Sequence, residues 1–530
     1  MKTAIGDLAS APIAIDPIWS RSMAKNWKHD RAADHIEKKI KDVETVTIVD
    51  YVRDMSLENI PANKAFRVDG VHLYADILNL TDMLNVTADE GVTCHRRTLR
   101  FLNLHYRAVH RILARCDARR VDFHNQRLHA LIAKPYNAEN DAEAKRVRRA
   151  VAIAQLIIDV LHETGDDDEH IPDADVRVGI DTGEALAVNN GRRGGREPLF
   201  LGEPANHAAK MSGGGSNPGI YLTNNARLAI GLAEAARPAN TPLTTAEIAS
   251  CQDAADLGVS KETIMAEWRE DLRKNPIGSF EFSRHTPPLR TLDMTTLTPA
   301  NTKRQESASV YADIDGFTAY VARHIEETPE DVVRVFHVIR AELDRVFTCD
   351  FDGRRIRFIG DCLHGLLCDG TVHTTDDKET VSTATLCAGA LRSSFELALE
   401  KLGDEGIDTD SLGLAIGFEF GPMTITRLGM QGDRVRCSVS RGVLTSEAEQ
   451  TRCSGDETAI GPLAHDAGTK AVRDLFGSGR KVKSLDYNEA VEVLAEKGDD
   501  TALAAKRAAF STPAIAAASE RIIRPYSERK

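Results

Sequence analysis

The sequence predicts an α+β protein made of two tandem copies of one domain. Three segments of the first half recur in the second half in the same order: 73–77 at 310–314, 123–131 at 358–366, and 177–183 at 415–421. The offsets of 237, 235 and 238 residues differ only as much as small loop changes between copies would allow. A chain of 530 residues is also too long for one core, because single cores stop growing near about 250–300 residues.

Each copy is expected to run strand, helix, hairpin, helix and second hairpin. The first strand of each copy ends near an aspartate, Asp76 or Asp313. Apolar residues then recur at alternating spacings of three and four, which is typical of a helix: Leu99, Leu102, Tyr106, Val109 and Leu113 in the first copy, and Val332, Phe336, Ile339, Leu343 and Val346 in the second. Second helices are expected at 143–165 and about 380–403. This order predicts helices on one face of a mixed sheet in each copy.

Composition sets the predicted boundaries between these parts. A Thr-Pro-Pro sequence and the Thr-, Asn-, Lys- and Gln-rich stretch after it are typical of a linker. The expected order is an N-terminal region of unknown role (1–65), a first domain with extra helices and a closing strand (66–285), the linker (286–305), a second domain (306–490), and a C-terminal tail (491–530).

The overall composition excludes several classes of protein. A net charge of −13 argues against a general nucleic-acid-binding surface, which needs an excess of Lys and Arg. No run of about 18 apolar residues is present, so no membrane span is expected. The nine cysteines form no Cys-x-x-Cys pair, and we interpret them as reduced thiols of a cytoplasmic protein.

The most informative motif is Val-Tyr-Ala-Asp-Ile-Asp-Gly-Phe-Thr at 310–318, followed by Arg-Phe-Ile-Gly-Asp at 357–361. A strand that delivers Asp313 and a hairpin that delivers Asp361 would place two carboxylates side by side. Paired carboxylates of this kind hold Mg²⁺ or Mn²⁺ against the phosphates of a nucleotide. The sequence therefore predicts a nucleotide site with divalent cations in the second copy.

These motifs resemble those of the class III nucleotidyl cyclases, over roughly 65–215 and 305–455. The resemblance implies a ferredoxin-like domain and an active site at the interface of two domains. One domain would supply two metal-binding aspartates, here Asp313 and Asp361, and the main-chain carbonyl of Ile314 would also reach one of two metal ions. In the first copy Gln126 stands where the second aspartate belongs, so only Asp76 remains there.

The other half of the family site shows the opposite asymmetry. In family members a helix carries an Asn that orients the ribose and an Arg, four residues on, that stabilises the transition state. The first copy has Asn206 and Lys210 at these positions, whereas alignment of the second copy gives Thr445 and Glu449. Lys for Arg keeps the charge and loses the planar fork. The resemblance therefore implies one working site and one dead site in a pseudo-twofold intramolecular dimer.

The resemblance also implies the chemistry. One metal ion would lower the pKa of the ribose 3′-hydroxyl, and the other would bind the β- and γ-phosphates and the leaving pyrophosphate. The 3′-oxygen would attack the α-phosphorus in line, while Lys210 offsets the charge on the phosphoryl oxygens. Arg434 and Arg436, which follow the turn at 429–432, are candidate triphosphate contacts.

Two positions indicate which base is used. Family members that use adenine carry Lys with Asp or Thr at these positions, and those that use guanine carry Glu with Cys. Here the pair is Asp122 and Leu199, which matches neither purine code. A carboxylate could accept a hydrogen bond from uracil N3–H or from cytosine N4–H₂, so the residues leave both pyrimidines open.

A tandem cyclase without a purine pair resembles the pyrimidine cyclases of bacterial Pycsar anti-phage systems. That resemblance favours UTP as substrate and cyclic UMP as product, which would activate a separate effector protein. Cyclic CMP is the alternative product, and a purine cyclase is a further one. A decayed cyclase that senses nucleotides without turning them over is a different class of function. It is disfavoured because the losses in the two copies are complementary and leave one full set.

Overall fold

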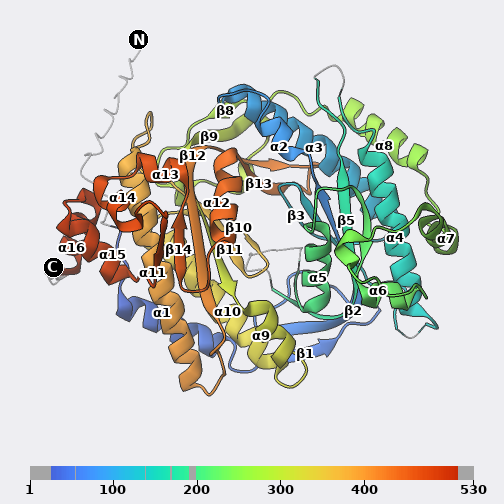
Figure 1. Cartoon of the computed structure of the whole chain (residues 1–530), viewed down its shortest axis with the longest axis horizontal. Coiled ribbons are helices and arrows are strands. Elements are labelled where there is room, and N and C mark those ends of the chain that lie inside the picture. The colour runs from blue at the N-terminus through green and yellow to red at the C-terminus, as the bar shows by residue number, and fades with distance from the viewer. Residues whose placement is uncertain (1–24, 54, 138, 167–169, 190–197, 511–530) are drawn as a thin grey trace, which may run out of the picture.

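The computed structural model describes residues 25–510 apart from 54, 138, 167–169 and 190–197. In Figure 1 a first half (47–283, blue to green) lies on the right and a second half (302–510, yellow to red) lies on the left. Each half has its own mixed sheet, and the two short helices α5 and α12 lie on the sides that face each other. The predicted mixed α/β fold is confirmed.

The first-half sheet has seven strands, with β2 at its centre between β4 and β5. Strands β4 and β5 run antiparallel to β2, and β7 adds to β5 in parallel. In the order β3-β4-β2-β5-β6, with β7 beside β5 and β1 beside β2, the bounds are β3 (Arg119–His124), β4 (Arg127–Ile132), β2 (Lys64–Ile77), β5 (Val176–Val188), β6 (Leu199–Leu201), β7 (Gly219–Leu222) and β1 (Thr47–Asp50).

The second-half sheet repeats this plan around β9, which lies between β11 and β12. Both neighbours are again antiparallel, and β14 adds to β12 in parallel as β7 does to β5. In the order β10-β11-β9-β12-β14-β15, with β13 beside β12 and β8 beside β9, the bounds are β10 (Arg354–Ile359), β11 (Cys362–Leu367), β9 (Thr302–Asp315), β12 (Gly413–Leu428), β14 (Glu457–Ile460), β15 (Lys481–Lys483), β13 (Val435–Val439) and β8 (Phe282–Ser283).

Two long helices in each half cover one face of its sheet, as the spacing of apolar residues predicts. They are α3 (Val92–Arg115) and α4 (Ala142–Leu161) in the first half, and α10 (Pro329–Arg345) and α11 (Asp377–Asp404) in the second. All ten residues of the two predicted stripes are buried. The shorter helices are α2 (Leu80–Leu84), α5 (Glu203–Ser212), α6 (Asn224–Ala229), α7 (Thr245–Ala255), α8 (Lys261–Lys274), α9 (Phe317–His324), α12 (Arg441–Thr451), α13 (Pro462–Ala467), α14 (Lys470–Phe476), α15 (Tyr487–Glu496) and α16 (Asp500–Phe510).

Equivalent strands of the two sheets carry the same aromatic pair. Tyr74 stacks on His129 with ring centroids 4.2 Å apart, and Tyr311 stacks on His364 with centroids 4.3 Å apart. Burial lowers the pKa of His364 to about 3 and holds that of His129 well below its usual value. Both imidazoles are therefore neutral packing groups rather than proton donors.

The N-terminal region packs on the second half rather than forming a separate part. Helix α1 (His29–Asp42), dark blue, lies among the yellow and orange helices of the second half in Figure 1. Trp27 and Ile36 belong to the same apolar core as α10 and α11, and the Trp27 indole N–H donates to Ser394 Oγ. The chain then crosses to the first half, where β1 pairs with β2. This segment therefore ties the two halves together.

Residues 286–305 do not form the predicted linker between two separate domains. Strand β9 begins at Thr302, and four apolar residues before it are buried against the second sheet: Leu289, Leu292, Met294 and Leu297. Their polar neighbours, which suggested a linker, form short 3₁₀ turns such as 294–296 and 299–301. The predicted tail is also structured in part, since α15 and α16 pack on α11.

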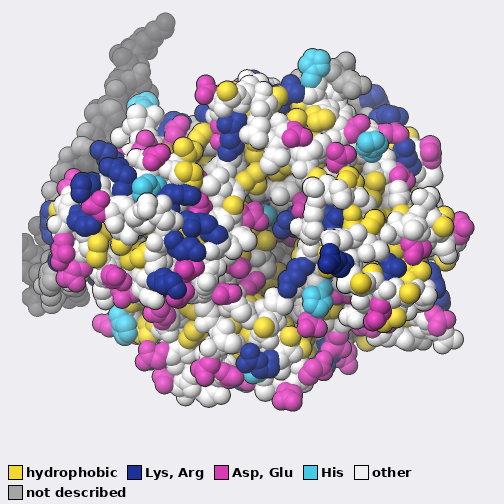
Figure 2. All heavy atoms as spheres, in the orientation of Figure 1, with side chains coloured by type: hydrophobic (Ala, Val, Ile, Leu, Met, Phe, Trp, Pro, Cys, Tyr) yellow, Lys and Arg dark blue, Asp and Glu magenta, His cyan; other side chains and the backbone are white. Residues whose placement is uncertain are grey.

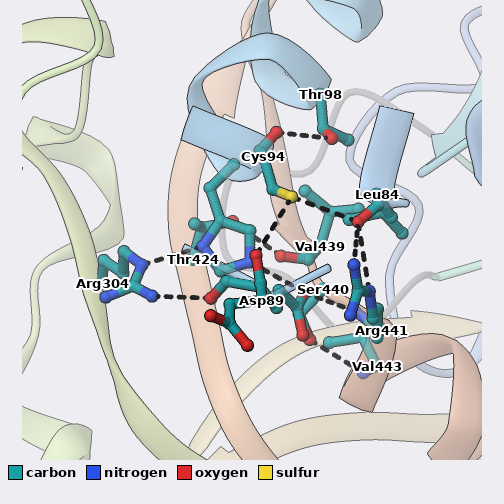
Figure 3. Close-up of polar contacts among 12 residues, drawn as sticks. Leu84, Asp89, Cys94, Thr98, Arg304, Thr424, Val439, Ser440, Arg441 and Val443 are labelled. Atoms are coloured by element: carbon teal, nitrogen blue, oxygen red, sulfur yellow. Dashed lines mark hydrogen bonds and ion pairs between the residues drawn. The ribbon is translucent and has the colours of Figure 1, made fainter. Parts of the chain in front are cut away.

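Polar contacts join the halves away from their centre (Figure 3). Arg304 of β9 donates from Nε to His95 Nδ1 at 3.0 Å and from Nη2 to the carbonyl of Glu90 at 3.0 Å. The main-chain N–H of Arg441 donates to Glu90 Oε1 at 2.6 Å.

Acidic and basic side chains are interspersed over the face seen in Figure 2. In the described part of the chain, no helix has both the length and the apolarity needed to cross a bilayer.

Candidate active site

Asp313 and Asp361 lie side by side at one end of the second sheet. Asp313 is the third-last residue of β9, and Asp361 occupies the turn between β10 and β11. Because Leu363 pairs with Ala312, the residues just before Leu363 run beside Asp313 and Ile314. The structure thus brings together the two carboxylates and the strand position whose carbonyl was expected to join them.

These two carboxyls are held close and partly away from water. Burial, reinforced by the charge of Asp315, raises the pKa of Asp313 to about 6. Burial and the neighbouring charge of Asp313 raise the pKa of Asp361 well above its usual value. Two crowded carboxylates with raised pKa values fit a divalent cation, which would offset their repulsion. Mg²⁺ is commonly bound by one or two carboxylates together with substrate phosphates, which is the donor set that this end of the sheet could supply.

We expect any binding of a divalent cation at these carboxyls to depend on pH. A carboxyl whose pKa is raised in the folded state adds stability below its unfolded value near 3.8 and loses it as the pH rises through about 6. Mn²⁺ must compete with that proton, so we expect Mn²⁺ to raise the Tm clearly at pH 8 and little at pH 5.5. The measurement is thermal unfolding with and without Mn²⁺ at both values, with Asp313→Asn as the control. Equal stabilisation at the two pH values, or full stabilisation of the control, would contradict this assignment.

In the first half Arg127 forms an ion pair with Asp76, the equivalent of Asp313. Asp76 is buried, and its Oδ2 accepts from Arg127 Nη2 at 3.0 Å. Arg127 follows Gln126 in the turn, as Cys362 follows Asp361 in the second half. The guanidinium supplies the positive charge that Asp76 needs, and Gln126 adds a neutral amide. At this end of the first sheet, Asp76 is therefore paired with Arg127.

Asn206 and Lys210 lie on α5, the first-half helix that faces the second half. Asn206 Nδ2 donates to Thr318 Oγ1 at 3.1 Å, which connects α5 to the start of α9 directly after the Asp313 strand. Lys210 is exposed one turn further along the helix. The chain turns sharply at Gly316, where φ is 79° and a Cβ would lie 2.4 Å from the Ser411 carbonyl oxygen. This turn brings Thr318 to α5.

The alignment of the second-half helix is wrong by one residue. Gly179 packs against α5 at Ser212, and Gly417 packs against α12 at Gln450, so the helices correspond at an offset of 238. Asn206 and Lys210 therefore match Leu444 and Ala448, not Thr445 and Glu449. Glu449 instead forms ion pairs with Arg452 and Arg480. The second half still lacks the polar pair, because neither Leu444 nor Ala448 carries a polar side chain.

A narrow pocket joins these residues between the halves. Its volume is about 80 Å³, below the roughly 300–1,000 Å³ of typical ligand pockets, so a whole nucleotide does not fit inside it. Both predicted base-binding residues line it, together with Asn206 and the Gly360 turn that precedes Asp361. The lining from the first half includes Tyr74, Asp122, His129, Leu199, Phe200 and Asn206, and that from the second half includes Arg340, Phe358, Ile359 and Gly360.

Neither Arg434 nor Arg436 lines this pocket. Arg436 pairs with Arg427 near the far end of β12, whereas Asp313 pairs with Ala415 near its start. Twelve residues of β12 separate these positions, yet the main chain of Arg436 lies beside the pocket, because its carbonyl accepts from Arg357, the partner of Asp122. The lining of the pocket therefore gives no support to triphosphate contacts by these arginines, and that role stays a prediction. Arg436 lies in β13 and Arg434 directly before it. The turn between β12 and β13 contacts α3, where Gly429 N–H donates to Asn103 Oδ1.

Two arginines at the site were missed from the sequence. Arg340 is stacked between Phe336 and Phe358, with its guanidinium carbon 4.4 and 3.8 Å from the ring centroids, and its charge acts to lower the pKa of Asp361. Arg357 donates to Asp122 Oδ1 at 2.8 Å. The spacing of apolar residues in the helix does not indicate a functional role for Arg340. Arg357, however, occupies the repeat position of Asp122 and could have been found by that comparison.

The chain resembles a solved structure over nearly its whole length. The crystal structure of a class III adenylyl cyclase-like ATP-binding protein from Pseudomonas aeruginosa superposes with a TM-score of 0.88 at 67% identity. The match covers 89% of this chain and 100% of that one. No family model matches the sequence. The fold, the paired carboxylates and this likeness define a class III nucleotidyl cyclase.

Curated relatives narrow the class further. A uridylate cyclase from Pseudomonas aeruginosa is 65% identical over 509 residues, which span 96% of this chain and 99% of the relative. A uridylate cyclase from a Rhizobium species is 40% identical over 441 residues, 79% of this chain and 82% of the relative. The chain belongs to the uridylate cyclase family of class III cyclases.

Proposed function

We propose that this chain converts UTP to 3′,5′-cyclic UMP and pyrophosphate at one site between its two halves. The observation that carries the proposal is the pocket that unites Asp122, Leu199 and Asn206 of the first half with the turn before Asp361 of the second. The likeness to two uridylate cyclases supports the choice of base. The halves, about 47–283 and 302–510, act in this proposal as a pseudo-twofold pair.

The residues of this chain have separate roles in the proposed reaction. Asp313, Asp361 and the Ile314 carbonyl would hold two divalent cations, Mg²⁺ or Mn²⁺, which when bound favour loss of the ribose 3′-proton and neutralise phosphate charge. Asn206, held by Thr318, orients the ribose. The 3′-oxygen forms a bond to the α-phosphorus as the bond to the bridging oxygen breaks, the hydroxyl proton goes to solvent, and pyrophosphate leaves. Lys210 offsets the charge that develops on the α-phosphoryl oxygens.

The residues that line the pocket indicate how the substrate would lie. A base would lie in the pocket beside Asp122 and Leu199, while the triphosphate would extend toward Asp313 and Asp361. The lining supports this division, because Asp122 and Leu199 lie in the same pocket as Gly360, the residue before Asp361. Asp122 would accept a hydrogen bond from the base, and Leu199 would supply an apolar wall.

The resemblance to Pycsar cyclases supports a biological setting for this activity. In this proposal the product is a second messenger of anti-phage defence, and it activates a separate effector protein. The enzyme would work in the cytoplasm, where its nine cysteines, all free thiols in the structure, stay reduced.

Incubating the purified chain with each of the four ribonucleoside triphosphates and Mn²⁺ tests the proposed activity. Cyclic UMP and pyrophosphate are expected from UTP, with less product from CTP and little from ATP or GTP. Chromatography of the products against cyclic standards is the readout, and Asp313→Asn is the matched inactive control. Preferred turnover of ATP or GTP would overturn the choice of base, and no turnover of any of the four would favour a nucleotide sensor.

A further inference from the structure

Asp122 and Arg357 occupy the same position in the two halves. Asp122 pairs with His129 across the β3–β4 hairpin, and Arg357 pairs with His364 across the β10–β11 hairpin. Both hairpins have an irregularity of register just before this position, between Arg120 and Asp122 and between Arg355 and Arg357. A bulge redirects the next side chain. The bulges thus direct the two equivalent residues toward each other across the centre of the molecule.

The contact between them is an ion pair with one deeply buried member. Arg357 Nη1 donates to Asp122 Oδ1 at 2.8 Å and to the Phe123 carbonyl at 2.8 Å, while Nη2 donates to the Arg436 carbonyl. The Arg357 side chain is 1% exposed, and that of Asp122 is 24% exposed. Arginine keeps its charge when buried, so this guanidinium depends on a carboxylate nearby. The pair restrains the position of Asp122 Oδ1.

We propose that Arg357 is a positioning residue for base selection, which holds Asp122 Oδ1 so that Oδ2 meets the bound pyrimidine. The proposal rests on the proposed function and deepens it. A carboxylate that rotates freely could accept from uracil N3–H or from cytosine N4–H₂. A carboxylate fixed opposite ring atom N3 meets a donor in uracil and a lone pair in cytosine. The ion pair therefore turns an acceptor that tolerates both bases into one that selects uracil.

The amide variant gives the sharpest test. In Asp122→Asn the amide oxygen should accept from Arg357, which leaves Nδ2–H₂ to face the base. That donor suits N3 of cytosine and not N3–H of uracil. We expect the ratio of kcat/KM for UTP to that for CTP to fall by roughly ten- to a hundredfold, mainly through KM for UTP. In the Arg357→Met background the amide can rotate, so the same change should have little further effect on this ratio.

Two single substitutions of Arg357 distinguish the effect of its hydrogen-bond geometry from the effect of its charge. Arg357→Met should lower the UTP-to-CTP ratio by roughly tenfold or more, because Asp122 becomes free to rotate. Arg357→Lys keeps the charge but has one donor nitrogen, so it cannot hold Asp122 and the Arg436 carbonyl from two separate nitrogens as the planar guanidinium does, and an intermediate ratio is expected. Arg304→Met is the matched control, because Arg304 also bridges the halves (Figure 3) and lies outside the pocket. It should lower the Tm and leave the ratio unchanged.

The experiment measures kcat and KM for UTP and CTP, and the Tm, for the wild type, the four single variants and the Arg357→Met/Asp122→Asn double variant. Non-additive effects on the ratio support the proposal. A ratio within twofold of the wild type in Arg357→Met, with a lower Tm like that of Arg304→Met, would reduce Arg357 to a structural role and overturn it. Effects that multiply in the double variant would also overturn it. If the wild type turned over neither pyrimidine, the proposed function would fail, and the same ratio read from UTP and CTP binding by calorimetry would still decide the role of Arg357.

Discussion

Asp313→Asn and Asp361→Asn are each expected to lower cyclisation by roughly a thousandfold or more, while Asp76→Asn keeps most of the activity. Asp361 follows Gly360 of the pocket lining and lies beside Asp313, so losing either carboxylate removes a ligand of the proposed cation site and the charge stabilisation it supports. Asp76 instead forms an ion pair with Arg127. Product formation from UTP at saturating Mn²⁺ is the measurement.

The same variants should differ in stability in the opposite direction. Burial and Asp315 raise the pKa of Asp313 to about 6, so at pH 8 its charge costs stability in the metal-free protein and Asp313→Asn should keep or raise the Tm. Burial raises the pKa of Asp76 as well, but Asp76→Asn breaks a buried ion pair by removing the carboxylate that accepts from Arg127, and it should lower the Tm. If the Asp76→Asn enzyme folds and is as inactive as Asp313→Asn, the carboxylates of the second half are not the ones that serve the working site.

The repeat made much of the fold predictable. The three recurring segments lie on equivalent strands, because each delivers a buried sheet position that both halves need. The apolar stripes likewise became α3 and α10. The position 238 residues on from Asn206 was harder to assign, since α12 carries several polar residues and only the packing of Gly417 on the helix fixes its register.

The errors arose where tertiary contacts outweigh local composition. The Thr-, Pro- and Asn-rich chain before β9 looks like a linker, yet Leu289 and Met294 within it fill a gap beside the second sheet. Arg434 and Arg436 follow a turn in the copy that holds the carboxylates, but neither lines the pocket, and Arg436 contributes its main-chain carbonyl to Arg357. Arg127 was passed over because an arginine beside a lost metal ligand reads as a surface charge until its pairing with Asp76 is seen.

Mixing two inactive chains tests most directly whether one site forms within one chain. Asn206→Ala should lose the ribose contact and reduce kcat strongly, and Asp313→Asn should abolish cation binding. If both parts of the site must lie in the same chain, an equimolar mixture of the two purified variants should be as inactive as each alone. Arg304 and Glu90, which join the halves within one chain, favour this result. The measurement is cyclic UMP formed by the mixture, with the mass of the active species taken from light scattering. We predict no rescue and an active wild-type monomer, and recovery of a substantial part of wild-type activity on mixing would contradict a site within one chain.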